Sequence, residues 1–318
     1  MVNTREVASN RPKLWGQLTS SPLWWWVGAS ALIGGLLSIP LFRGDLAVTA
    51  WGLELSRESI LLQWWNDVAA RSLFQGESPG AQDLTYATLI LVLAVYFSAL
   101  TPFWGPKASG IRLFAGYYLA CMLLFLVTNR GLKAFFGRAR PQDVLRGDQD
   151  YSSIWLIGPY GFSEAMSKGS FTSGHTTTAM FLLPMAVCLW CASRRSLAWS
   201  VLLLALAWGS MVGVGRVFHG SHYPGDVLWA IIICLWICAF AAYRLFGLDR
   251  RGQSPAMLSG WELQLTIWSA LTLFALFAAV IGVKQMVFEP TWYWPLVLVL
   301  STLAAWISSI KTARLTRS

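Results

Sequence analysis

The chain has 318 residues, of which 56% are hydrophobic and only 12% are charged, and its mean hydropathy is +0.53. Soluble globular domains contain about 25% charged residues, so this composition argues against an ordinary soluble protein and indicates an integral membrane protein. The formal net charge of +9 does not indicate nucleic-acid binding, because the basic residues lie between apolar segments. Membrane topology and anionic headgroups explain those residues better.

Apolar runs that approach the ~20 residues needed to cross a bilayer begin after a polar N-terminal tail. The first run is too long for the core of a cleavable signal peptide, so we expect it to be retained as a helix. A polar bend over 247–262 precedes the last two runs, which we expect to form an appended hairpin. Eight runs qualify as candidate spans, at 23–42, 84–102, 112–128, 174–192, 198–214, 226–246, 263–283 and 292–310.

The pattern predicts an all-α, polytopic membrane helix bundle with about eight transmembrane helices. We divide it into a cytoplasmic tail over 1–22, a six-helix core over 23–246, and the hairpin with a C-terminal tail over 247–318. The segment 43–83 carries tryptophans among polar residues, and we expect it to lie along the headgroups as short amphipathic helices. The five cysteines fall inside apolar runs, which is typical of small, buried, reduced side chains.

Basic residues set the expected orientation, because Lys and Arg concentrate in cytoplasmic loops. With a cytoplasmic N-terminus, that side carries the excess of basic residues once Arg216 and a basic cluster in 129–172 are set aside. We therefore expect both termini in the cytoplasm and a local cationic cluster on the outer face.

Three polar segments beside the apolar runs all fall on this expected outer face, where ionisable groups are costly unless they pair or do chemistry. In the first, Lys133 and Arg140 can offer a point charge and a planar fork to phosphate oxygens, and Pro141 stops any helix and fixes where Arg140 points. Three further arginines of this segment are interpreted as ordinary headgroup-binding residues: Arg130, Arg138 and Arg146.

The second segment, Ser173-Gly174-His175, begins a predicted helix. Ser173 can cap the helix, and Gly174 lets the backbone approach a ligand closely. Free amides at a helix N-terminus favour an anion. A capping role alone would explain the serine but not His175 at the mouth of the helix.

The third segment places His222 and Asp226 four residues apart. Asp226 can accept a proton from one imidazole nitrogen and fix the tautomer, which leaves the other nitrogen free to attack phosphorus. Arg216 adds a third cation for charge that grows in the transition state. His219 is either a supporting hydrogen-bonding residue or a plain loop histidine. No close pair of carboxylates accompanies the histidines, so the pattern does not favour a metal site.

Together, Lys133-x6-Arg140-Pro141, Ser173-Gly174-His175 and Arg216-x5-His222-x3-Asp226 resemble the three-part signature of the type 2 phosphatidic acid phosphatase (PAP2) superfamily. The resemblance covers roughly 120–245. It implies that Lys133, Arg140 and Arg216 bind phosphate with contacts from Ser173 and Gly174. It also implies that His222 is the nucleophile, that Asp226 orients it, that His175 protonates the leaving group, and that no metal or other cofactor is needed.

Two positions depart from the family pattern, Thr172 where proline usually precedes Ser-Gly-His and Gly215 where serine often precedes the arginine. Neither removes a catalytic group. The Phe-Gly-Arg-Ala-Arg-Pro run and the expected outer-face site are similar to bacterial lipid phosphatases, including lipid A phosphatases and undecaprenyl pyrophosphate phosphatases. That narrower resemblance rests on much less sequence.

These observations predict a membrane phosphatase of the bacterial inner membrane that hydrolyses a lipid phosphate or pyrophosphate on its periplasmic side. Glycerophospholipids, polyprenyl pyrophosphates and lipid A are the candidate substrates. Three alternatives stay open. One is a lipid phosphotransferase with the same site. Another is a vanadate haloperoxidase, which eight spans argue against. The last is a non-catalytic lipid binder or transporter. The sequence does not predict an oligomeric state.

Overall fold

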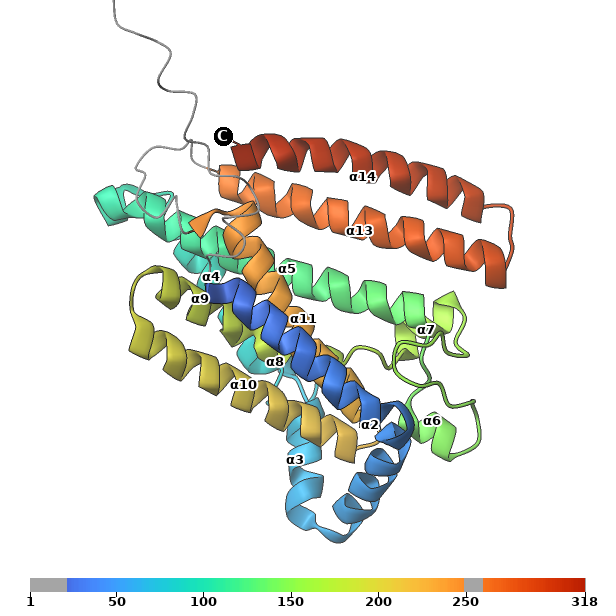
Figure 1. The fold of residues 1–318 in the computed structure, drawn as a ribbon. Coiled ribbons are helices and arrows are strands. Elements are labelled where there is room, and N and C mark those ends of the chain that lie inside the picture. The colour runs from blue at the N-terminus through green and yellow to red at the C-terminus, as the bar shows by residue number, and fades with distance from the viewer. Residues whose placement is uncertain (1–21, 249–259, 318) are drawn as a thin grey trace, which may run out of the picture.

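The computed structural model describes residues 22–248 and 260–317, and within these ranges every regular element is helical (Figure 1). Almost all of the predicted tail 1–22, and most of the predicted bend 247–262, lie outside the described residues. The elements are α2 Pro22–Glu58, α3 Ile60–Ala70, η1 Leu73–Gln75, α4 Asp83–Ser98, η2 Pro102–Lys107, α5 Ala108–Phe136, α6 Pro141–Leu145, α7 Phe162–Lys168, α8 Gly174–Ala179, η3 Met180–Leu182, α9 Leu183–Cys191, α10 Arg195–Phe218, α11 Pro224–Phe240, the π-turn η4 Ala241–Leu245, α13 Trp261–Phe288 and α14 Trp294–Arg317.

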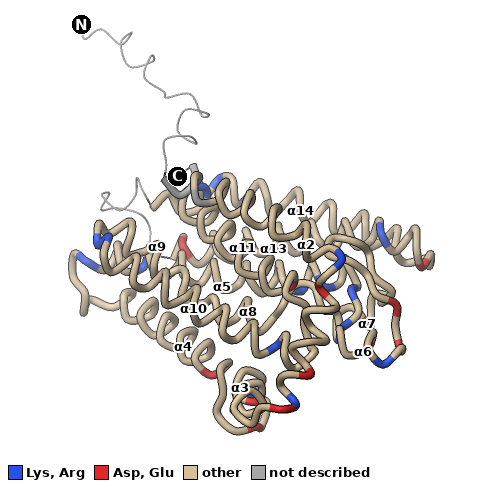
Figure 2. The backbone as a smooth tube through the Cα atoms, turned by 60° about the horizontal axis from the view of Figure 1, so that its bottom comes forward, with Lys and Arg blue, Asp and Glu red and all other residues tan. Residues whose placement is uncertain are grey.

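Seven helical segments in the described part of the chain are long and apolar enough to cross a membrane. Charged residues lie mainly toward the two ends of the bundle, and the middles of the helices are largely uncharged (Figure 2). The predicted polytopic helical bundle is therefore confirmed. The one expected span that is not among these seven is 84–102. It forms α4 with only 16 residues, which is shorter than the ~20 residues that a perpendicular crossing requires.

The predicted end of the first helix at residue 42 is wrong, because α2 continues through Pro40 to Glu58. Three polar residues of its second half, Asp45, Thr49 and Ser56, are buried in the bundle rather than spread along headgroups, whereas the charged residues Arg43, Glu54, Arg57 and Glu58 are exposed. Asp45 and Thr49 are fully buried, and the Ser56 hydroxyl donates to the carbonyl of Phe218 at 3.0 Å. Partners inside the protein thus allow this polar stretch to remain part of one long helix.

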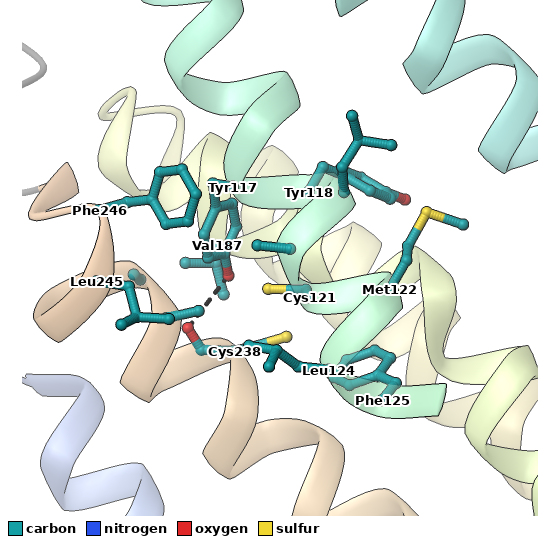
Figure 3. Close-up of a cluster of buried hydrophobic side chains, with 14 of the residues drawn as sticks. Tyr117, Tyr118, Cys121, Met122, Leu124, Phe125, Val187, Cys238, Leu245 and Phe246 are labelled. Carbon is teal, nitrogen blue, oxygen red and sulfur yellow. Dashed lines mark hydrogen bonds between the residues drawn. The ribbon is translucent and has the colours of Figure 1, made fainter. Parts of the chain in front are cut away.

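The central helix is α5, which is longer at both ends than the predicted span 112–128. Its middle forms the main core with side chains from α9, α11 and the segment that follows α11 (Figure 3). The Tyr117 hydroxyl donates to the carbonyl of Cys238 at 3.2 Å, so this buried hydroxyl is paired. Cys121, Cys234 and Cys238 are buried, in agreement with the sequence interpretation, whereas Cys188 and Cys191 are only half-buried.

The C-terminal end of α5 brings Lys133 into the last turn of a helix rather than into a loop. The helix ends at Gly137, which has a left-handed φ of 59° and whose N–H donates to the carbonyl of Lys133 at 2.9 Å. This is a common glycine cap. A Cβ at Gly137 would lie only 2.4 Å from the carbonyl oxygen of Tyr160, so the turn toward Arg138 depends on glycine.

Three further helices differ from their predicted bounds where they meet the polar segments. The predicted helix 174–192 is interrupted by the 3₁₀ turn η3, which precedes Pro184. The next helix extends beyond the predicted residue 214, so Arg216 lies in the last turn of α10. A short loop then carries His222 to the start of α11 at Pro224.

The last two long helices pack on the outside of this arrangement, with α13 against α5 and α14 against α13 (Figure 1). At the end where α6 and α7 lie, the rings of Phe162 in α7 and Trp294 in α14 meet edge to face at 5.4 Å. The same end of α13 carries Lys284, whose ammonium lies 3.5 Å from the carbonyl of Ala134. The hairpin therefore touches the segments that hold the polar cluster described below.

Candidate active site

The three polar segments converge at one end of the bundle, where α5 and α10 end and where α8 and α11 begin. The rings of His175 and His222 lie 6.5 Å apart between centroids. His175 is also an electrostatic neighbour of Lys133, Arg140 and Arg216. The structure thus brings together all eight site residues that the sequence singled out: Lys133, Arg140, Ser173, Gly174, His175, Arg216, His222 and Asp226.

Lys133 and Arg140 are both held by carbonyl groups at the C-terminal end of α7. The Lys133 ammonium donates to the carbonyl of Gly169, and the Arg140 Nε donates to the carbonyl of Lys168 at 2.8 Å. An ammonium has three N–H donors and a guanidinium has five. Both groups are therefore fixed in position while donors remain available for a bound anion.

Arg216 has donors that no group in the described part of the chain satisfies. Arg216 is only 6% exposed to solvent. Nη2 donates to the Ser221 hydroxyl at 2.8 Å, whereas Nε and Nη1 are buried without a hydrogen-bond partner. A buried charged donor that is left unpaired costs more free energy than a neutral donor in the same situation. A guanidinium with two unpartnered nitrogens, Nε and Nη1, beside other cations is suited to bind an anion.

The first turn of α8 carries Ser173, Gly174 and His175. Ser173 is the N-cap, as predicted, and its hydroxyl accepts from the N–H of Thr176 at 3.3 Å. A Cβ at Gly174 would meet the side-chain oxygen of Asn129 at 3.3 Å. This glycine therefore keeps the start of the helix open beside Lys133 and His175.

One ring nitrogen of His222, Nδ1, is held by a hydrogen bond to the backbone, and this leaves Nε2 available for chemistry. Its Nδ1 lies 2.9 Å from the carbonyl oxygen of Ser170. A carbonyl oxygen only accepts, so Nδ1 carries the hydrogen and Nε2 keeps its lone pair. Burial lowers the pKa of His222 to about 3, which keeps the imidazole neutral near pH 7. A neutral imidazole with a free Nε2 has the form required of a nucleophile.

Asp226 stands behind this imidazole but is shared with other groups. Its Oδ2 lies 3.6 Å from Nδ1 of His222, which is within ion-pair range and longer than a hydrogen bond. The same oxygen accepts from the Ser170 hydroxyl and from the N–H of Tyr223. Ser170 therefore links the two, because its carbonyl fixes His222 and its hydroxyl binds the carboxylate. Asp226 is close enough to stabilise positive charge that develops on the imidazole.

Arg138 pairs with Asp226 from the opposite side and is among the most buried side chains, at 1% exposure. Its Nη1 donates to Oδ1 of Asp226 at 2.7 Å, and its Nη2 donates to Oδ2 of Asp45 at 2.9 Å. Nε completes the set with the carbonyl of Ser152 at 2.9 Å. The interpretation of Arg138 as a headgroup-binding residue is therefore wrong, because every edge of its guanidinium is used inside the protein.

Sequence reasoning missed three residues that build the site: Asp45, Arg138 and Ser170. Asp45 gave no signal, because it follows the predicted first span 23–42 and lies in the segment 43–83, which was expected along the headgroups. Its other oxygen accepts from the N–H of Gly225 at 2.9 Å. Ser170 gave no signal, because it acts through both its carbonyl and its hydroxyl.

The donor set of this cluster consists of three cations and the imidazoles of His175 and His222. In the part of the chain that the structure describes, no group of three or more His, Cys, Asp and Glu side chains is placed to hold a metal ion. The free donors of Arg216, with Lys133, Arg140 and the start of α8, can instead surround a phosphoryl group.

Comparison with known proteins agrees with this geometry. The family model of the PAP2 superfamily matches residues 114–250, a range that contains the eight predicted site residues. Neither a curated protein nor a solved structure gives a significant match to the chain. Superfamily members are generally phosphatases. Residues 114–250 of this membrane-helical chain, which are less than half of its length, therefore match the PAP2 superfamily.

Proposed function

We propose that the chain is an integral membrane phosphatase that hydrolyses a lipid phosphate or lipid pyrophosphate through a phosphohistidine at His222. The observation that carries this proposal is the pair of buried, unpartnered donors of Arg216 in the same cluster as a neutral imidazole. Phosphoryl transfer relies on positioning and electrostatic stabilisation. The two unused donors are placed to supply that stabilisation to phosphoryl oxygens.

In the first step, Nε2 of His222 attacks phosphorus and a P–N bond forms. The bond from phosphorus to the lipid oxygen breaks, and His175, which acts as the imidazolium, gives its proton to the leaving oxygen and becomes neutral. Lys133, Arg140 and Arg216 hold the equatorial oxygens as their charge redistributes. Asp226, with its 3.6 Å approach to Nδ1, stabilises the positive charge that His222 acquires.

In the second step, water attacks the phosphohistidine and gives a proton to His175. The P–N bond breaks, its electron pair returns to Nε2 of His222, and inorganic phosphate leaves. The proton inventory closes, because His175 loses one proton in the first step and regains one in the second. A lipid hydroxyl in place of water would make the same site a phosphotransferase.

We also propose the bacterial inner membrane as the location, with both ends of the chain in the cytoplasm and the site facing the periplasm. The residues Arg194 and Arg195 follow α9, at the end of α10 opposite to Arg216. A basic loop at that end supports a cytoplasmic assignment. Labelling of single introduced cysteines at residue 194 and at residue 148 with a membrane-impermeant thiol reagent tests it, and preferential labelling of 194 in intact cells would reverse the orientation.

The test of the activity uses detergent-purified protein with chelator and a panel of phospholipid, polyprenyl and lipid A phosphates. We expect phosphate release from one class, and loss of release in His222→Ala. Arg140→Ala removes a proposed phosphate-binding charge and should lower phosphate release. Arg146→Ala is its matched control, because the Arg146 side chain is 61% exposed and pairs with Asp143 and Asp148 instead.

Each other outcome has a distinct meaning. Substantial turnover in folded His222→Ala would refute the phosphohistidine. Transfer of radiolabelled phosphate to an added acceptor lipid, with no free phosphate, would identify a phosphotransferase. Lipid binding without either product would leave a binding or transport role, and halide oxidation after addition of vanadate would indicate a haloperoxidase.

A further inference from the structure

His219 is the one histidine among the three in the sequence that takes no part in the proposed chemistry. It is the C-cap of α10 and lies three residues after Arg216. Its side chain is solvent-exposed on one side, but its Nδ1 lies 2.7 Å from the hydroxyl oxygen of Ser221. Ser221 is 1% exposed, so this contact connects solvent to a buried hydroxyl.

The Ser221 hydroxyl lies between His219 and Arg216. The guanidinium has no acceptor, so at 2.8 Å Nη2 of Arg216 must donate to Oγ of Ser221. The hydroxyl then has its own hydrogen available for Nδ1 of His219. When the hydroxyl donates to Nδ1, the hydrogen bonds run from Arg216 to Ser221 to His219, and neutral His219 carries its hydrogen on Nε2.

We propose that His219 and Ser221 are positioning residues that orient Arg216 for the phosphoryl group. This inference rests on the proposed phosphatase function. Nη2 of this guanidinium has a hydrogen-bond partner, Ser221, whereas Nε and Nη1 have none among the described residues. Ser221 thus limits rotation of the group and aims the two free donors in one direction, and His219 in turn sets the direction of the hydroxyl.

The chain also couples Arg216 to pH. Burial and the neighbouring Arg216 cation lower the pKa of His219, so it is neutral near pH 7. As the pH falls, a proton on Nδ1 takes away the acceptor of the Ser221 hydroxyl and places a second cation beside Arg216. The charged groups that face His219 are Arg216 of α10, Asp67 of α3 and Arg140 before α6.

The experiment measures vanadate affinity by calorimetry and KM and kcat by phosphate release, on the full chain in detergent. Ser221→Ala should weaken vanadate binding about tenfold, which is the size of one hydrogen bond to a charged group, and should raise KM more than it lowers kcat. His219→Ala should act in the same direction. His219→Asn should restore near-wild-type affinity, because its Oδ1 takes the place of Nδ1.

A structural role and a positioning role differ in two readouts. The double variant Ser221→Ala/His219→Ala should be no weaker than Ser221→Ala alone, because the two residues act in series. The affinity of wild type for vanadate, relative to that of His219→Asn, should fall as the pH is lowered below the pKa of His219, because only wild type gains the proton. His219 is exposed, so its variants should fold even where Ser221→Ala does not.

Equal affinity in wild type and both alanine variants would overturn the inference, as would a His219→Asn variant that is as weak as His219→Ala. Those results leave the proposed function intact if wild-type protein still releases phosphate. Wild-type protein that neither binds vanadate nor releases phosphate would instead defeat the proposed function itself.

Discussion

Replacing Arg138 with methionine removes the cation shared by Asp226 and Asp45 while it keeps much of the side-chain volume. The two carboxylates are both 0% exposed, and the guanidinium lies 2.7 Å from one and 2.9 Å from the other. Breaking a buried pair by removal of one partner costs about 3–5 kcal/mol, because it leaves an uncompensated buried charge. We therefore expect Arg138→Met to lose at least that much stability.

The assay is unfolding by SDS in mixed micelles, followed by helical circular dichroism. The destabilisation of the double variant Asp45→Asn/Arg138→Met should be smaller than the sum of the two single-variant effects by about 1–3 kcal/mol. The reason is that Arg138→Met alone leaves two buried carboxylates unpaired, whereas the double variant leaves only Asp226. Arg146→Met is the control, and removal of its exposed pairs should cost no more than about 1 kcal/mol.

Two results would refute this reasoning. One is an Arg138→Met protein as stable as the Arg146→Met control, which would mean that the buried guanidinium compensates no charge. The other is strict additivity of Asp45→Asn and Arg138→Met. That outcome would show that Asp45 and Arg138 do not interact, despite the distance between them.

Three further predictions concern the same end of the bundle. Gly137→Ala should destabilise the protein by about 1–2 kcal/mol or more, because φ is 59° and the added Cβ would lie 2.4 Å from the carbonyl oxygen of Tyr160; an unchanged SDS midpoint would contradict this. Ser170→Ala should lower kcat more than it raises KM, because it removes a donor to Asp226 and leaves the carbonyl that holds His222; an effect on KM alone would count against it. Because the folded-state pKa of His222 is about 3 and its ordinary value is 6.5, the unfolded chain takes up a proton that the folded protein does not. Stability should therefore fall below pH 6.5 by up to about 1.4 kcal/mol per pH unit, and His222→Gln should show a shallower slope between pH 6.5 and 4.5.

The polar segments could be assigned from sequence because their chemistry is local. Spacing places His222 and Asp226 one turn apart, and a serine before Gly-His is a recognisable cap. The apolar runs likewise predict that the segments meet at one face, since each adjoins a span. Such arguments need only residue type and order.

What sequence did not reveal depends on long-range partners. Asp45 and Arg138 are 93 residues apart, and nothing local indicates that one neutralises the other. The same lack of local information explains the error at residue 42, because buried partners allow α2 to continue through a polar stretch. The extension of α5 to Phe136 was missed because Lys133 looked like the start of a loop.

The measurement that tests the central proposal most directly is the trapping of the phosphoenzyme. Detergent-purified wild-type protein is mixed with a lipid substrate labelled with radioactive phosphate and quenched in alkali, and the label is located by peptide mass spectrometry. The account predicts acid-labile label on His222, absent from His222→Ala and retained in His219→Asn. Label on another residue, or an undiminished label in His222→Ala, would contradict it.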